Sequence, residues 1–257
     1  MVVAGLVGGG GGGLTPLIFA AREGDSESAK ALLDAGAQVN QQSEYGWSPL
    51  LTAVNNRNYQ LAKLLLDRGA DVNLANKGLW TPLYLATDNR NIEGGDYPVP
   101  KADMDHLEFI RLLLEKGANP NAQLKLRPPY RMVSQDRLAD PSIDYGATPL
   151  LRAAKAADVE AMKVLLDAGA LVDLQNVYGH TPLIVVAGAT RGRATPTRGG
   201  NYTEAQAIDA VKLLLAAGAD VNASGFKGPT TERGETLRCT GCWPPVDFPR
   251  LRDHSGQ

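Results

Sequence analysis

The residues best suited to chemistry are two cysteines near the C-terminal end. Cys239 and Cys242 are the only cysteines among 257 residues, and their Cys-x-x-Cys spacing fits half a zinc site or a redox pair. A zinc site needs two more ligands, and only His254 lies nearby in the sequence. A thioredoxin-like redox pair needs a strand–helix–strand context that these residues lack. We therefore expect no metal site, no redox centre and no disulfide framework.

Other patterns that could support catalysis are equally weak. The glycines of 8–13 match any phosphate-loop spacing, but no convincing strand precedes them. The histidines His106, His180 and His254 belong to no metalloprotease motif, and no nucleophile elbow is present. Carboxylates such as Asp34 and Asp67 recur near expected helix ends, which favours a solvated role. We expect no catalytic residue, no cofactor and no enzyme activity.

Composition is that of a globular protein and excludes several partner classes. Lys plus Arg is 26 and Asp plus Glu is 28, with a pI near 6.0, so a basic nucleic-acid-binding face is not expected. No segment approaches the roughly 18 apolar residues of a membrane span, and the N-terminus lacks the basic region of a signal peptide. We expect a monomer that binds neither nucleic acid nor membrane. The location is open: cytoplasmic if the N-terminus is complete, secreted or periplasmic if it is truncated.

An internal repeat decides the fold class. A Thr-Pro-Leu or Ser-Pro-Leu triplet recurs with three spacings of 33 residues and one of 67. A Gly-Ala pair follows each triplet. The triplets start at Thr15, Ser48, Thr81, Thr148 and Thr181, and the pairs start at Gly36, Gly69, Gly117, Gly169 and Gly218.

Each repeat reads as two helices. The hydroxyl of Thr or Ser suits a helix N-cap, and Pro suits the first helical position because its missing N–H would be unpaired there. The second helix carries apolar residues at helical spacing, as in 61–66, and the glycine ends it in the left-handed conformation. An extended piece then leads to the next repeat.

This pattern resembles the ankyrin repeat, in which a turn and two antiparallel helices follow the signature T-P-L-x-x-A and L-L-x-x-G-A-x-V-N. The resemblance covers about Leu14 to Asn222. Within the family, the sequence looks more like bacterial ankyrin-repeat proteins than like eukaryotic ones. The histidine usual after the Pro is replaced in every unit, and Leu79 stands where a glycine precedes the other triplets. The resemblance implies an all-α solenoid of about five units with loop insertions.

The units predict the domain organisation. A Gly-rich leader occupies 1–13, and ankyrin repeats occupy 14–223. The expected units are 14–42, 43–75, 76–142, 143–175 and 176–223. Residues 224–257 read as an incomplete sixth unit followed by a disordered or frameshifted tail, because a shifted reading frame from about Leu237 allows a further unit opening. Such arrays need polar end caps, and we expect this chain to lack both.

Binding in this architecture falls on the hairpin tips and first helices. Aromatic residues make up only 6% of the chain, yet they gather one and three residues before the triplets. Because aromatic residues dominate interface energetics, we expect these positions to be exposed and to bind a partner. The alternative is that the rings pack as scaffold. The predicted partner-binding residues are Tyr45, Trp47, Asn55, Asn56, Lys77, Trp80, Asp88, Tyr145, Lys155, Tyr178 and His180.

Replacing Trp47 and Trp80 with alanine should abolish partner capture and leave the melting temperature nearly unchanged, whereas lost stability would indicate scaffold packing. Three insertions, about 91–105, 124–141 and 190–203, are further candidates for contact, and the middle one should emerge on the hairpin side.

The sequence therefore predicts a non-enzymatic protein–protein interaction scaffold that binds through its concave hairpin and helix face. One alternative is an inhibitor or immunity-type regulator of a partner enzyme. Another is a fragment of a larger secreted ankyrin protein. The sequence does not identify the partner.

Overall fold

The computed structural model describes residues 12–91, 101–125, 145–188 and 202–225. All of them belong to one compact part of the chain, Met1–Gly225. The Cys239 and Cys242 pair, the tail and most of the three insertions lie outside the described residues. The expectations placed on those segments stay predictions.

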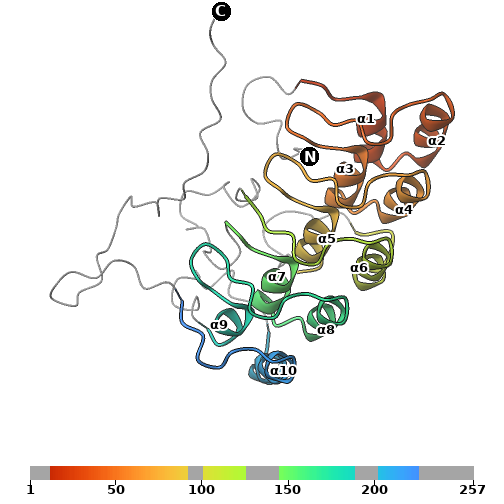
Figure 1. The fold of residues 1–257 in the computed structure, drawn as a ribbon. Coiled ribbons are helices and arrows are strands. Elements are labelled where there is room, and N and C mark those ends of the chain that lie inside the picture. Colours follow the sequence, from red (N-terminus) through yellow and green to blue (C-terminus); the bar gives the residue numbers. More distant parts are fainter. Residues whose placement is uncertain (1–11, 92–100, 126–144, 189–201, 226–257) are drawn as a thin grey trace, which may run out of the picture. The chain divides into compact units, whose positions relative to one another are not determined.

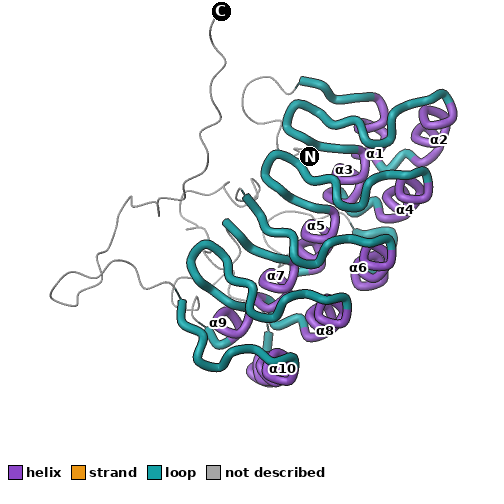
Figure 2. Tube along the Cα trace, viewed as in Figure 1, coloured by secondary structure: helices purple, strands orange, loops and turns teal. Residues whose placement is uncertain are grey.

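Within the described residues, ten helices form two rows and no strand is present (Figures 1 and 2). Each inner helix contacts the next inner helix and the outer helix of its own unit. The inner helices are α1 (Pro16–Glu23), α3 (Pro49–Asn55), α5 (Pro82–Arg90), α7 (Pro149–Lys155) and α9 (Pro182–Val186). The outer helices are α2 (Ser26–Asp34), α4 (Tyr59–Asp67), α6 (His106–Glu115), α8 (Val159–Asp167) and α10 (Glu204–Ala216). This arrangement confirms the expected all-α solenoid.

The triplets begin the inner helices as the sequence predicts. In each unit the Thr or Ser side chain accepts a hydrogen bond of 3.1 to 3.2 Å from the backbone N–H three residues later. The accepting residues are Thr15, Ser48, Thr81, Thr148 and Thr181. A cap of this kind contributes about 1 kcal/mol to stability.

The glycines of the Gly-Ala pairs follow the outer helices in the left-handed conformation. Their φ angles lie between 88° and 91°, and an added Cβ would meet nothing within 4 Å. Backbone conformation, and not lack of space, therefore requires glycine here. These residues are Gly36, Gly69, Gly117, Gly169 and Gly218.

Leu79 takes the left-handed conformation that glycine takes in the other units. Its φ is 58°, whereas Gly46 and Gly179 at the equivalent positions have 80° and 73°. The glycine has moved to position 78, where a Cβ would lie 2.9 Å from Nε1 of Trp80. Close packing therefore holds the glycine at 78, and Leu79 bears the backbone strain.

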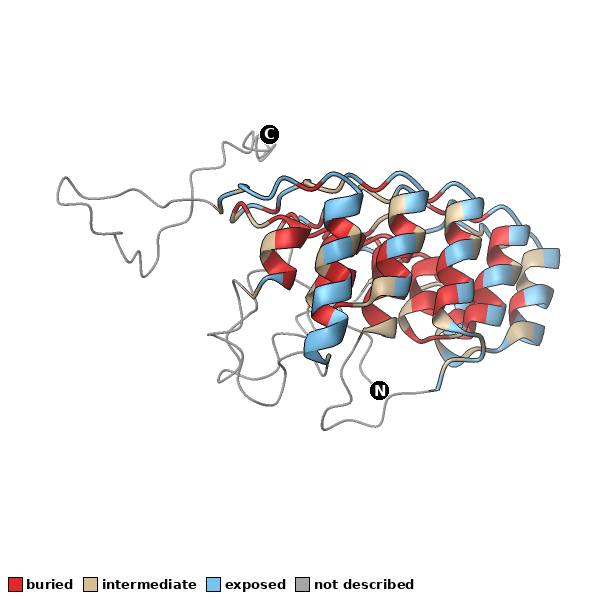
Figure 3. Cartoon of the chain, turned by 90° about the horizontal axis from the view of Figure 1, so that it is seen from below, coloured by how far each residue is buried: buried red, intermediate tan, exposed pale blue. Residues whose placement is uncertain are grey.

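The core runs without a break between the two rows of helices. Figure 3 shows the buried faces turned inward and the exposed faces on the far side of the outer helices. Equivalent leucines of successive units, such as Leu50, Leu83 and Leu150, are buried in one cluster. No unit could bury these side chains alone, so each depends on its neighbours.

A ladder of asparagines joins successive units. Each asparagine donates its Nδ2 to a glycine carbonyl of the next unit, at 2.9 to 3.2 Å, and accepts a backbone N–H two residues beyond that glycine. The ladder residues are Asn40, Asn73 and Asn121. At the last junction Asp173 takes this place and accepts the N–H of Asp220, at 3.0 Å, but a carboxylate cannot donate.

The first insertion returns to cap a helix of the preceding unit. Asn58 precedes α4 but makes no side-chain cap bond. Instead the carboxylate of Asp103 accepts the backbone N–H of Tyr59 at 2.7 Å and that of Gln60 at 3.1 Å. An acidic residue from the third unit therefore stabilises the N-terminus of a second-unit helix.

Candidate functional site

The hairpins between units carry seven of the eleven predicted partner-binding residues. Neighbouring hairpins are joined by main-chain hydrogen bonds. The N–H of Lys77 donates to the carbonyl of Tyr45 at 3.2 Å, and the N–H of Val177 donates to that of Tyr145 at 3.1 Å. The tips of adjacent hairpins therefore lie side by side.

Side chains within the hairpins fix the shape of these tips. The Oδ1 of Asn76 accepts the backbone N–H groups of Gly78 and Trp80, at 2.9 and 3.1 Å. Asn176 does the same for Tyr178 and His180, both at 3.0 Å. Such turns satisfy the backbone locally and order the tip before any partner arrives.

The two tryptophans are buried, so the expectation that they are exposed is wrong. Trp47 is 3% exposed and Trp80 is 4% exposed. Their rings meet edge to face with centroids 5.7 Å apart. Each lies one residue before a helix cap, and the ring of Trp47 packs against that of Trp80 on the next hairpin. The pair is scaffold beneath the tips.

The tips present a different set of side chains to solvent, which we call the hairpin face. Lys77, Leu79 and Val177 are exposed on it. Half-buried aromatic residues accompany them, and the rings of Tyr178 and His180 lie with centroids 6.2 Å apart. The half-buried members are Tyr45, Tyr145, Tyr178 and His180.

At the ends of the inner helices the predicted positions divide in the same way. Asn55 and Lys155 are half-buried, whereas Asn56 and Asp88 are buried, contrary to expectation. The Nδ2 of Asn56 donates to the carbonyl of Thr52 at 2.8 Å, which turns the side chain back onto its own helix.

A buried ion pair explains why Asp88 is inaccessible. Its carboxylate accepts a hydrogen bond from Nε of Arg152, and both side chains are almost wholly buried. Arg152 also donates to the carbonyl of Asn91. The pair joins α5 to α7 across 64 residues of sequence, which is why the repeat pattern alone does not reveal it.

A second polar cluster around Tyr59 also escapes the sequence analysis. The Tyr59 hydroxyl lies 2.8 Å from Nδ1 of His106, and its ring stacks on Phe109 with centroids 4.3 Å apart. Burial raises the pKa of Tyr59, and burial together with the charge of Arg57 lowers the pKa of His106. The sequence does carry a signal for this cluster. Tyr59 and His106 each begin an outer helix, and no other outer helix of the described residues begins with an aromatic residue.

The cluster continues into the inner helices. Asn89 donates to the carbonyl of Val54 at 2.7 Å, and Arg57 donates to the carbonyl of Asn89 at 3.1 Å. These bonds tie the end of α3 to the end of α5. The groups are buried and mutually satisfied, so the cluster serves the scaffold better than catalysis.

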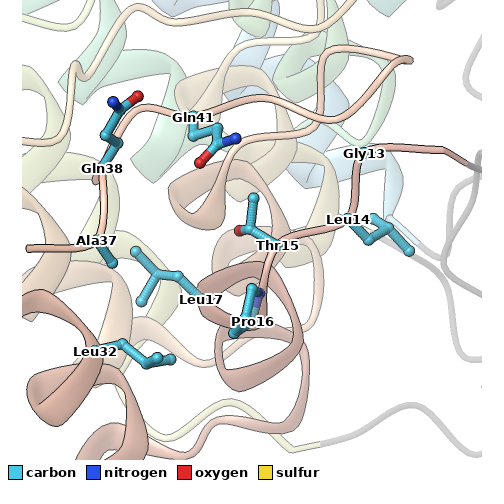
Figure 4. A pocket seen from close by; sticks show the side chains of 9 residues that line it. All are labelled: Gly13, Leu14, Thr15, Pro16, Leu17, Leu32, Ala37, Gln38 and Gln41. Carbon is cyan, nitrogen blue, oxygen red and sulfur yellow. The ribbon is translucent and has the colours of Figure 1, made fainter. Parts of the chain in front are cut away.

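The N-terminal edge of the stack carries a shallow hollow of about 440 Å³ (Figure 4). Apolar side chains from α1, α2 and the first hairpin line it, among them Leu14, Leu17 and Leu32. Gln38 and Gln41 stand at its rim.

The described segments hold no group of three or more His, Cys, Asp or Glu side chains placed to bind a metal ion. No helix in the described ranges has the length and apolar character that a membrane span requires.

The two rows of helices and the linked hairpins define a helical-hairpin repeat solenoid, and the comparisons identify its family. Residues 17–124 match the family described as ankyrin repeats (3 copies), and residues 145–177 and 178–225 each match the ankyrin repeat. The chain belongs to the ankyrin-repeat family, whose members generally act as protein–protein interaction modules and not as enzymes.

One curated relative is an Arabidopsis thaliana protein, the E3 ubiquitin-protein ligase KEG. It is 30% identical over 121 residues, which are 47% of this chain and 5% of the ligase. The similarity therefore concerns a small part of that protein.

Proposed function

We propose that this chain is a non-enzymatic scaffold that binds a protein partner across the hairpin face and the adjoining ends of the inner helices. The observation that carries the proposal is the contrast between two layers of one surface. Tyr45, Tyr145 and Tyr178 recur at one hairpin position and are half-buried, whereas Trp47 and Trp80, which stand two positions further along the second and third hairpins, are buried. Partly exposed aromatic side chains on hairpin tips that are held by hydrogen bonds and buried residues are a low-entropy arrangement for binding.

The chemistry of the hairpin face supports a partner surface of mixed character. Leu79 and Val177 offer apolar area, and Lys77 adds positive charge. Tyrosine suits such an interface because it combines a large apolar ring with a hydroxyl. Binding of this kind involves no covalent chemistry, so the proposal assigns no catalytic group.

The experiment is a capture assay with the full chain as bait. The test variant combines Tyr45→Ser, Lys77→Glu and Tyr178→Ser on the hairpin face. The matched control combines Lys30→Glu, Arg111→Ser and Lys163→Ser, all exposed on outer helices. We expect native bait and control to retain the same partner and the hairpin variant to lose it. Retention by the hairpin variant, or loss by the control alone, would contradict the proposal.

A further inference from the structure

The C-terminal edge of the described stack exposes apolar side chains whose counterparts in the preceding units are buried or half-buried. Val221 is 72% exposed, whereas Val72 at the same repeat position is 9% exposed. Leu215 is 43% exposed, whereas its counterpart Leu66 is 7% exposed. The described stack ends here, whereas a further unit follows the interior counterparts, so these residues mark a surface that could receive another unit.

The N-terminal edge shows the opposite half of the same interface. Phe19 is exposed on α1, whereas its counterpart Leu85 in the third unit is buried. The hollow lined by Leu14, Leu17 and Leu32 lies on this edge as well (Figure 4). The C-terminal edge therefore presents the exposed side chains of Val221 and Leu215, and the N-terminal edge presents an apolar hollow.

The asparagine ladder gives the two edges a polar match. Asn222 stands four residues after Gly218, as Asn40 stands after Gly36, and its side chain has no hydrogen-bond partner among the described residues. In the first unit the Gly36 carbonyl and the Gln38 N–H, which such an asparagine would engage, have no partner in the described part of the chain. Donor and acceptor on one edge thus complement acceptor and donor on the other.

We propose that a second copy of this chain is the occupant, and that copies associate head to tail through these two edges. The contact would continue the interface that already joins successive units, with Val221 and Leu215 facing the hollow and Asn222 engaging Gly36 and Gln38 of the next copy. A heterologous contact of this kind leaves one edge open at each end, so it produces chains of copies and no closed dimer. The proposal departs from the expected monomer and does not depend on the hairpin face.

Sedimentation of the full chain over a range of concentrations tests the proposal. We expect the weight-average mass to rise steadily with concentration. Val221→Glu should block one edge and Phe19→Glu the other, so that each variant alone associates at least about tenfold more weakly than the native chain. Leu171→Glu is the matched control, because Leu171 is exposed and apolar but lies on neither edge. It should associate like the native chain.

Mixing the two blocked variants provides the decisive readout. Each retains one intact edge of opposite kind, so an equimolar mixture should form a dimer and stop there. Asn222→Ala is a second C-terminal edge variant that should weaken association without adding charge. A native chain that stays monomeric at every concentration would overturn the proposal, as would a mixture that fails to dimerise. The first result would indicate an edge covered within the same chain.

Discussion

At the scale of single residues, Leu79 offers the clearest test of the backbone. Its φ of 58° is a conformation that asparagine tolerates, leucine resists and a β-branched residue resists more strongly. Because the side chain is exposed, substitution changes little packing. We expect Leu79→Asn to be the most stable, the native chain intermediate and Leu79→Val the least stable. The unfolding free energies measured in urea should span about 1 kcal/mol or more. Equal stability of the two variants would show that residue 79 bears no strain.

His106 predicts a pH dependence at the same scale. Burial and the charge of Arg57 lower its pKa below the ordinary 6.5. The unfolded chain therefore binds this proton more readily, and the stability contribution is present above about pH 6.5 and lost as the pH falls below it. The carboxyls with lowered pKa, such as Asp105, lose their contribution only near or below pH 3.8. Between about pH 7.5 and 5.5, His106→Gln should unfold at a urea midpoint that changes less than that of the native chain. The same change in both proteins would exclude His106 as the source.

At the scale of elements, the tryptophan pair joins two hairpins. Removing either ring leaves a buried gap, so Trp47→Ala or Trp80→Ala should cost about 3–5 kcal/mol of unfolding free energy. The double variant should cost less than the sum of the single ones, because the rings contact each other. Trp47→Phe is the milder control. An unchanged melting temperature in both single variants would contradict a scaffold role for the pair.

The asparagine ladder predicts a gain at the last junction. Asp173 accepts one hydrogen bond there but cannot donate to the Gly218 carbonyl. Asp173→Asn should add that donor and remove a negative charge beside Asp220, raising stability by about 0.5–1.5 kcal/mol. The reverse change, Asn73→Asp, should lower stability by a similar amount. A variant pair that moves in the same direction would count against the ladder.

At the scale of the whole molecule, the repeat predicted the fold far better than the site. The caps at Thr15 or Ser48 and the turn at Gly36 follow from local chemistry, so sequence alone located them. The burial of Trp47 depends on a neighbouring hairpin, and the spacing of triplets carries no information on which side of a tip is covered. The pair of Asp88 and Arg152 joins helices separated by insertions of irregular length, and no periodic pattern encodes such a contact.

The central claim is that a protein partner binds the hairpin face over a rigid, buried base. Hydrogen–deuterium exchange on the full chain, with and without the captured partner, tests it most directly. We predict that the partner slows exchange at the tips around 43–47, 76–80 and 176–180 and at the ends of the inner helices, and leaves the outer helices unchanged. Protection confined to the outer helices α2, α4, α6 and α8 would contradict this account.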